Sequence, residues 1–374
     1  MTKNLDWQKE WVSMPEYKNV KQPPPKITAT FKFRNEEDYN TFKDKVKKYL
    51  YNNKKVFDGT QTIDKKQAWF PLREKDSKYC YSRTKDRKQN KFPIYIISKG
   101  RFKRNPTSSI LKKMNIPFQI IVEKQEYEQY CKIIDKKNIL ILPDNYKSDY
   151  DTFWKDNDPR TGPGPARNYA WDHSVKNKYK WHWVMDDNIE SFERFNNNKK
   201  IRCNDNSLFL ASEDFVLRYT NVAIAGLQYS YFMPYSDFRP PFKLNTRIYS
   251  CLLIRNDIPY RWRGRYNEDT DLSIRVLKDN WCTVQFNAFL QGKRATQTNE
   301  GGCNDEFYKN EGTLNKSKIL QDMHPDITKV AKRFNRWHHY VNYSGFKKNK
   351  LIKKDTIKIK NIINDYGMTV KEVN

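Results

Sequence analysis

The chain has 374 residues, with 71 Lys and Arg against 44 Asp and Glu, which gives a formal net charge of +27 at pH 7. This length is enough for one large domain with a sizeable core and a smaller second domain. A surplus of this size favours a polyanionic partner, although a proteome rich in Lys would also leave an ordinary protein basic. Aromatic residues make up 15% of the chain, which argues against a largely disordered protein.

Neither the cysteines nor the amino-terminal residues indicate an exported protein or a protein with a structural zinc site. The six cysteines are scattered and form no CxxC pair, which argues against a zinc ribbon and against a disulfide scaffold. The first residues contain no apolar run long enough for a signal peptide, and no window approaches the roughly 18 apolar residues of a membrane span. The sequence therefore predicts a cytoplasmic protein with no membrane partner, and it does not indicate an oligomeric state.

The amino-terminal quarter of the chain predicts an accessory module. Residues 1–26 form an extension that ends in the Pro-rich stretch KQPPPK. Residues 27–75 predict a small α+β module, in which the strands ITATFKF and KQAWFPL flank a helix that begins after Asn35 as its N-cap. The polar, charged residues 76–91 follow and predict a linker.

From residue 92 to about 330 the sequence pattern changes to short apolar runs separated by predicted helices. Strands that alternate with helices predict an α/β domain with a mostly parallel, Rossmann-type sheet and flanking helices. Ligands of such sheets bind at the carboxyl ends of the strands. The predicted strands lie in FPIYIISKGR, FQIIVEK, NILILP, KWHWVMDDN and NVAIAGL.

The last segment, residues 331–374, is basic with interleaved aromatic residues. We expect it to be helical and to contact nucleic acid through cations that include Lys347 and Lys348.

Two adjacent carboxylates, Asp186 and Asp187, end the run KWHWVM. Mg²⁺ and Mn²⁺ prefer oxygen ligands, and one or two protein carboxylates are enough when the ion also binds a diphosphate. The simpler interpretation is a buried strand that runs into a polar turn. His324 is a candidate third metal ligand.

The stretch GPGPARN at residues 162–168 predicts a tight turn followed by a helix that begins near Pro165. Arg167 and Asn168 in the first turn are candidates for phosphate or ribose contacts, aided by the positive end of the helix. An ordinary Gly/Pro loop with an exposed arginine is the alternative.

A third stretch, RWRGRYNEDTDL, predicts a helix with Asn267 as N-cap. Glu268 or Asp269 is the candidate general base that deprotonates an acceptor hydroxyl, although acids in a first turn also stabilise a helix without any catalytic role. Three neighbouring arginines are candidate contacts to a bound polyanion: Arg261, Arg263 and Arg265. A weaker candidate for a phosphate loop is TNEGGCND, residues 298–305.

Together these stretches resemble the TET/J-binding-protein-associated glycosyltransferases, which are GT-A-type enzymes of phages and some eukaryotes. The resemblance spans roughly residues 92–325, with the motifs in the expected order. It is carried by FPIYIISKGRFKRNPTSSILKKMNIPFQIIVEKQEYEQY, GPGPARN, WVMDDNIESF and RGRYNEDTDLSIRVLK.

The resemblance implies a GT-A-like fold and a role for each motif. Asp186 and Asp187 become the motif for Mn²⁺ or Mg²⁺, with Asp186 also on the nucleotide sugar, and Glu268 or Asp269 becomes the catalytic carboxylate. The motif reads Asp-Asp-Asn and not a strict Asp-x-Asp, so the acid that binds the metal directly stays open. The other residues implied to bind the nucleotide sugar are Ser98, Lys99, Gly100, Arg101, Glu123, Arg167 and Asn168.

The implied activity is transfer of a sugar from a nucleotide sugar, with UDP as the expected nucleotide, to a hydroxymethylated pyrimidine in DNA. The most favoured acceptor is 5-hydroxymethylcytosine, and a phage-encoded enzyme would act in the host cytoplasm. Two alternatives are the same fold acting on a polysaccharide or a protein, and a DNA-binding protein without catalysis. The charge of +27 favours DNA over a neutral glycan. The clustered acids favour an enzyme over a simple binding protein.

Overall fold

The computed structural model describes residues 7–21, 31–46, 76–83, 89–154, 161–235, 237–293, 314–333, 336–357, 359 and 362–373. The two strands predicted at 27–33 and 66–72 lie wholly or mainly outside these residues, as does the predicted phosphate loop at 298–305.

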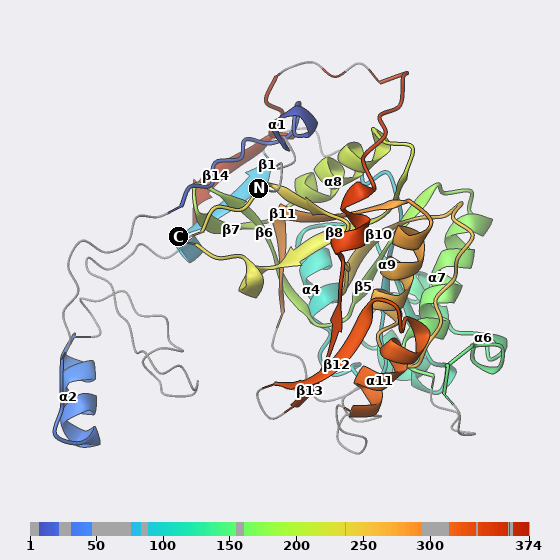
Figure 1. Ribbon diagram of the computed structural model, residues 1–374, viewed down its shortest axis with the longest axis horizontal. Coiled ribbons are helices and arrows are strands. Elements are labelled where there is room, and N and C mark those ends of the chain that lie inside the picture. The colour runs from blue at the N-terminus through green and yellow to red at the C-terminus, as the bar shows by residue number, and fades with distance from the viewer. Residues whose placement is uncertain are drawn as a thin grey trace.

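In the described residues, one large sheet of twelve strands runs through the molecule, and a two-stranded ribbon stands beside it (Figure 1). The strand order in the large sheet is β14-β1-β7-β6-β11-β8-β10-β5-β2-β3-β4, with β9 paired to β11. The strands are β1 Tyr79–Arg83, β2 Ile94–Ile97, β3 Gln119–Val122, β4 Ile139–Ile141, β5 Trp181–Asp186, β6 Ile189–Asn196, β7 Lys199–Cys203, β8 Val222–Tyr229, β9 Phe242–Leu244, β10 Cys251–Arg255, β11 Cys282–Lys293, β12 Thr328–Arg333, β13 Arg336–Val341 and β14 Met368–Glu372.

The five strands predicted from the apolar runs are confirmed as β2, β3, β4, β5 and β8. The first four form a parallel block, because β2 pairs with both β3 and β5, and β3 pairs with β4, all in parallel. The prediction of a mostly parallel sheet is nevertheless wrong. Beyond β5 the sheet is mixed, since β10 pairs antiparallel with both β5 and β8, and β11 pairs parallel with β8 but antiparallel with β6.

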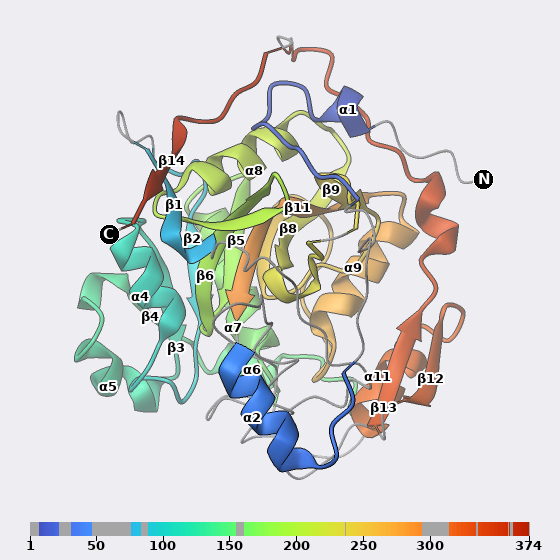
Figure 2. The ribbon, with the colours of Figure 1, turned by 90° about the vertical axis from the view of Figure 1, so that its left-hand side faces the viewer.

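Helices cover both faces of the sheet (Figure 2). Buried residues of α4 and α8 belong to the large core cluster on one face, and those of α7 and α9 belong to two smaller clusters on the other. The helices are α1 Trp7–Glu10, α2 Glu36–Val46, α4 Pro106–Lys113, α5 Tyr127–Cys131, α6 Asn145–Ser148, α7 Gly164–Lys176, α8 Ser207–Leu217, α9 Glu268–Lys278 and α11 Leu314–Met323. Single turns of 3₁₀-helix are η1 Asp76–Lys78, η2 Lys124–Glu126, η3 Lys136–Asn138, η4 Ser230–Phe232 and η6 Ser344–Lys348.

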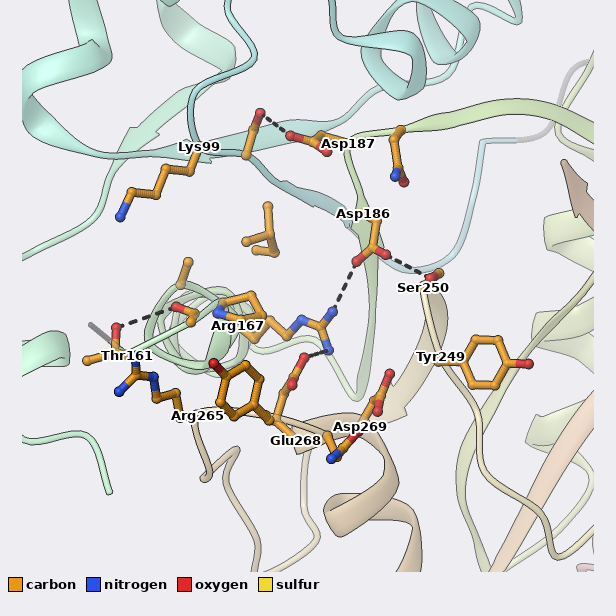
Figure 3. Close-up of a pocket in the computed structure, with 18 of the residues that line it drawn as sticks. Lys99, Thr161, Arg167, Asp186, Asp187, Tyr249, Ser250, Arg265, Glu268 and Asp269 are labelled. Atoms are coloured by element: carbon orange, nitrogen blue, oxygen red, sulfur yellow. Dashed lines mark hydrogen bonds and ion pairs between the residues drawn. The ribbon is translucent and has the colours of Figure 1, made fainter. Parts of the chain in front are cut away.

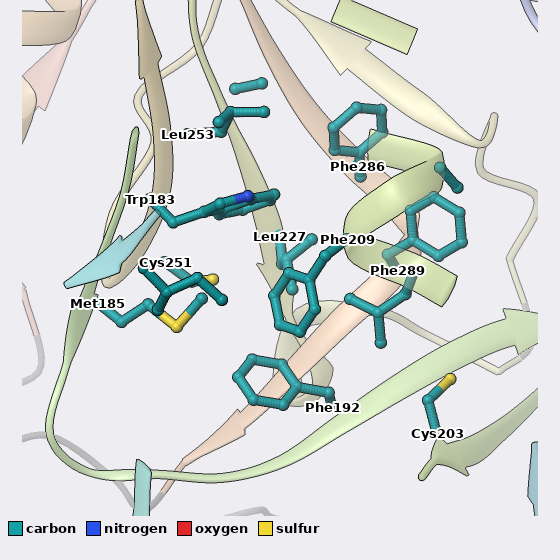
Figure 4. Close-up of a cluster of buried hydrophobic side chains, with 14 of the residues drawn as sticks. Trp183, Met185, Phe192, Cys203, Phe209, Leu227, Cys251, Leu253, Phe286 and Phe289 are labelled. Carbon is teal, nitrogen blue, oxygen red and sulfur yellow. The ribbon is translucent and has the colours of Figure 1, made fainter. Parts of the chain in front are cut away.

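The large core cluster is built around aromatic side chains (Figure 4). Trp183 of β5 and Phe192 of β6 both meet the ring of Phe209 of α8 edge-on, at centroid distances of 5.1 and 4.9 Å. The indole N–H of Trp183 donates to Glu213 at 2.9 Å, which satisfies its only polar atom. Burial raises the pKa of Glu213 to about 7. Consecutive residues of β5 alternate between the two faces, and its last residue emerges at the edge of the sheet.

Both end segments of the chain pack on this core. Trp11 is 6% exposed and stacks on Phe242 at 6.0 Å. Near the other end, β14 pairs antiparallel with β1. The prediction that residues 331–374 are helical is wrong, because their described elements are the end of β12, β13, η6 and β14. Alternating residues in RWHHYV and MTVKE favour strands, and this alternation outweighs the helix-forming lysines nearby.

The amino-terminal module is described only around its helix. α2 begins after Asn35, as predicted, and the amide of Asp38 donates to Asn35 Oδ1 at 2.8 Å. The proposed domain boundaries stay predictions. No helix in the described ranges is both long and apolar enough to cross a membrane.

A stability prediction follows from the close approach of β8 and β10. A Cβ atom on Gly226 would overlap the carbonyl oxygen of Cys251 and the side chain of Ile248. Gly226→Ala should therefore lower the free energy of unfolding by about 1–3 kcal/mol. Gly345→Ala is the control, since nothing lies within 4 Å of its added methyl group, and it should change stability by less than about 0.5 kcal/mol. Equal urea unfolding curves for both variants would contradict this packing.

Candidate active site

A cleft of about 450 Å³ opens at one edge of the large sheet (Figure 3). The pairing register makes β2, β3, β5, β8 and β11 run in the same direction, so their carboxyl ends meet at this edge. The first turns of α7 and α9 close the cleft from the side. Polar side chains from these strand ends and helix starts line it: Ser98, Lys99, Glu123, Arg167, Asp186, Asp187, Glu268, Asp269 and Lys293.

Asp186 ends β5 and is held by donors from three other elements. One carboxylate oxygen accepts from Arg167 at 3.0 Å, and the other accepts from Ser250 at 2.7 Å and from Lys293 at 3.1 Å. Burial favours the neutral acid, but Lys293 and Arg167 outweigh it and lower the pKa of Asp186 to about 2. Its side chain is 27% exposed, so this charged carboxylate faces the cleft.

Asp187 has the opposite character, because its side chain is only 5% exposed. It accepts from Ser98 at 2.7 Å and forms an ion pair with Arg101. Burial raises the pKa of Asp187 despite these partners. Thr107 fixes the turn itself, since its amide donates to the carbonyl of Asp187 and its hydroxyl to that of Asp186.

Arg167 bridges the two sides of the cleft (Figure 3). One guanidinium nitrogen contacts Asp186, and another lies 3.1 Å from Glu268 at the start of α9. The ring of Trp262 packs 4.7 Å from the guanidinium carbon. Burial disfavours the charge on Arg167, but Glu268 and Asp186 outweigh it and raise its pKa. Burial raises the pKa of Glu268 to about 7, against the opposing charge of Arg167.

Asp269 also lines the cleft, beside Glu268. One of its oxygens accepts from the amide of Thr270 at 2.7 Å. The preceding Asn267 stands at the N-cap position, as predicted, but adopts φ 55° and makes no capping hydrogen bond with its side chain. Its amide group instead donates to the carbonyl of Lys316 at 2.6 Å. The start of α9 is therefore tied to α11 through Asn267 and is not closed by a capping side chain.

Glu123, which follows β3, also lines the cleft. Lys147 and Lys99 contact its two oxygens at 2.5 and 3.1 Å. Burial opposes ionisation of Glu123, but the hydrogen bonds from Lys147 and Gln125 and the charge of Lys99 prevail and lower its pKa. This end of the cleft combines a charged acceptor with two cations.

Several residues predicted for the site do not line the cleft. Asn168 forms a pair of hydrogen bonds with the backbone of Trp262, so it fastens α7 to the neighbouring loop. The buried His324 contacts Asp271 at 2.9 Å and is not among the residues that line the cleft with Asp186 and Asp187, and its role as a third metal ligand stays a prediction.

Of the three arginines predicted to contact a bound polyanion, Arg265 alone lines the cleft, where it packs over Trp154 at 4.6 Å. Arg261 pairs with Asp172, and Arg263 pairs with Asp271. The remaining predicted residues lie elsewhere on the surface or the rim: Gly100, Lys347 and Lys348.

Sequence reasoning missed Lys293, the last residue of β11, whose side chain is 10% exposed. Asp186 lies close enough to raise its pKa, against the effect of burial. The signal was present, since CTVQFNAFLQGK is an apolar run that ends in a charged residue, as does the run before Asp186. Other cleft residues that the sequence did not single out are Tyr229, Phe232, Arg247, Tyr249, Ser250, Lys316 and His339.

The acids at the end of β5 have the donor chemistry of a divalent-cation site that is completed by a ligand. Hard cations prefer carboxylate oxygens and often take only one or two from the protein when a diphosphate supplies the rest. The described residues contain no group of three metal-ligating side chains, which excludes a cage made by that part of the protein alone. Of the two acids, Asp186 is the one exposed to the cleft, whereas Asp187 is covered by Arg101 and Ser98.

Comparison with known families identifies the class of enzyme to which the chain belongs. Residues 92–302, more than half of the chain, match the family model of the TET-associated glycosyltransferases. The chain belongs to this family, and it is therefore a glycosyltransferase. No curated protein matches the sequence. The matched segment contains every cleft residue described above except Lys316 and His339.

The raised pKa of Glu268 generates a prediction about pH. With a pKa of about 7, Glu268 is neutral at lower pH and ionised at higher pH, and only the ionised form pairs with Arg167. The kcat/KM of transfer should therefore fall as the pH drops below about 7. The Glu268→Gln variant should lose this fall of kcat/KM at low pH. The Asp172→Asn variant, on the exposed side of α7, should keep it. If the fall of kcat/KM at low pH persists unchanged in Glu268→Gln, another group is responsible for it.

Proposed function

We propose that this glycosyltransferase moves a sugar from a UDP-linked donor to the hydroxyl of a hydroxymethylated pyrimidine in DNA, with 5-hydroxymethylcytosine as the leading acceptor. The observation that carries the proposal is the bridge from Asp186 through Arg167 to Glu268, at 3.0 and 3.1 Å. It joins a group of acids and cations suited to a nucleotide diphosphate with a pair of acids suited to an acceptor hydroxyl. Both groups line one cleft.

The donor side is assigned from its charges. Lys293 and Arg167 are cations beside Asp186, and Lys99 and Arg101 follow β2 on the same edge. These four residues are suited to offset the charge of a diphosphate, as cationic side chains do at transferring phosphate groups. Asp186, supported by Asp187, would hold Mg²⁺ or Mn²⁺, which supplies further neutralisation of the leaving diphosphate.

The transfer step needs one proton acceptor. The acceptor oxygen forms a bond to the anomeric carbon of the sugar, while the bond from that carbon to the diphosphate breaks. The electron pair of the broken bond leaves with the nucleoside diphosphate. The hydroxyl proton passes to a carboxylate, for which Asp269 is proposed because one of its oxygens is held by Thr270 and the side chain lines the cleft. Glu268, already paired with Arg167, is assigned to positioning that arginine.

A row of aromatic rings supports a planar acceptor. Tyr249, Tyr229 and Phe232 line the cleft, with ring centroids 4.6 and 5.8 Å apart along the row. Tyr231 extends the row outward from Phe232 at 5.5 Å. Phe232 and Tyr231 are 56% and 65% exposed, and exposed aromatic side chains beside a cleft are suited to stack on a base turned out of a duplex. The net charge of +27 favours a polyanion over a neutral polysaccharide.

The proposal is tested by the product. DNA containing 5-hydroxymethylcytosine is incubated with the enzyme and a panel of nucleotide sugars, and the nucleosides are then measured by mass spectrometry. A hexose or N-acetylhexosamine adduct on the modified nucleoside, strongest with one UDP-sugar and absent from unmodified DNA, is the expected result. Transfer to a polysaccharide or protein acceptor, with none to DNA, would replace the proposal with the alternative acceptor.

A pair of variants separates the two sides of the cleft. Asp269→Asn should bind UDP with near-normal affinity in calorimetry, while its single-turnover rate falls by about 10²–10⁴-fold, as expected for loss of a general base. Asp186→Asn should instead lose the increase in UDP affinity that Mn²⁺ gives the unaltered enzyme. Loss of UDP binding in both variants would refute this division of roles. Calorimetry that shows no effect of Mn²⁺ on the unaltered enzyme would refute the metal assignment.

A further inference from the structure

The two-stranded ribbon of β12 and β13 lies outside the segment that matches the family. Its strands pair antiparallel over six residues each and are not part of the large sheet (Figure 1). The sequence from Thr328 to Val341 has no Asp or Glu. It contains four permanently charged cations: Lys329, Lys332, Arg333 and Arg336.

Most of these cations lie on one face of the ribbon. The register pairs Lys329 with Tyr340 and Arg333 with Arg336, and directly paired residues project from the same face. All four side chains are exposed, and the guanidinium of Arg333 lies 4.9 Å from the ring of Tyr340. This face therefore presents three cations and an aromatic ring to solvent.

The opposite face borders the catalytic cleft. His339 projects from it and lines the cleft with Lys316 of α11 and with Arg247. Burial, together with the charges of Arg247 and Lys316, lowers the pKa of His339 to about 3. The positive charge on this side of the cleft therefore comes from Lys316 and Arg247, because His339 is neutral. Since Asn267 donates to the carbonyl of Lys316, the ribbon stands on the side of the cleft where Glu268 and Asp269 lie.

We propose that the β12–β13 ribbon binds the duplex on either side of the acceptor base, with Lys329, Arg333 and Arg336 on its phosphates. A two-stranded ribbon has the width of the DNA major groove, and exposed cations on a segment that contains no Asp or Glu match a polyphosphate backbone. The position beside the acceptor acids brings duplex held there close to the cleft. The inference rests on the proposed DNA acceptor, and it assigns the ribbon to affinity and not to the chemical step.

The test compares two triple variants with equal loss of charge. Lys329→Gln/Arg333→Gln/Arg336→Gln alters the ribbon, and Lys132→Gln/Lys136→Gln/Lys137→Gln alters exposed lysines near α5 and η3, at the other side of the molecule (Figure 2). Binding to an unmodified 20-base-pair duplex is measured by fluorescence anisotropy at several salt concentrations. The ribbon variant should lose at least tenfold in affinity, and its slope of log K against log salt should decrease by about 2–3, since each lost phosphate contact contributes about 0.9. The control variant should keep the slope of the unaltered protein.

Transfer kinetics complete the test. For duplex containing 5-hydroxymethylcytosine, the ribbon variant should show a raised KM and an unchanged kcat, and its UDP affinity and melting temperature should equal those of the unaltered enzyme. An equal loss of affinity in both triple variants, or an equal loss for heparin and for duplex, would overturn the inference. Because the anisotropy experiment uses unmodified DNA, it measures binding of duplex by the ribbon independently of the transfer reaction. Absence of transfer to DNA by the unaltered enzyme would instead count against the proposed function.

Discussion

The site depends on one buried cation. Arg167 is 4% exposed and is held in place by Asp186, Glu268 and the ring of Trp262. A guanidinium in such a position is tolerated only because two carboxylates offset the cost of removing its charge from water. Its planar shape lets it reach both acids at once, which the single ammonium of a lysine does less well. The separation of Asp186 from Glu268 is thus set by the size of one side chain on α7.

Strand direction explains why residues far apart in the sequence meet here. Ser98, Glu123, Asp186, Tyr229 and Lys293 each end or follow a strand, and the five strands point the same way although two of them lie beyond an antiparallel neighbour. β10 makes this possible, since it separates β5 from β8 and reverses the direction twice. The cleft therefore extends across the switch from the parallel block to the mixed part of the sheet, where ligands of open sheets commonly bind.

The sequence predicted the parallel block, the turn at Asp186 and the helix starts at Pro165 and Asn267, because each combines an apolar run with a local signal. It did not predict β10 or β11, and so it missed Lys293. Their pairing partners are distant in the chain, and periodicity within a short window does not carry that information. The sequence also contained no sign that His324 contacts Asp271, because that contact is made only in the folded chain. The roles of the cleft residues remain predictions, because geometry alone does not identify a substrate.

The way both ends of the chain are fastened has a consequence for how the protein is divided. The carbonyls of Val12 and Ser13 accept from Arg218 at 2.6 and 3.1 Å, and Asp365 pairs with Arg194 of β6 at 2.7 Å. Residues that precede and follow the segment matched by the family model therefore pack against it and complete part of its core. The segment that carries the catalytic motifs is therefore shorter than the part of the chain that packs together as one core. A fragment cut at the limits of the matched segment would lose Trp11 and expose Phe242 and its aromatic neighbours to water, and we expect such a fragment to aggregate.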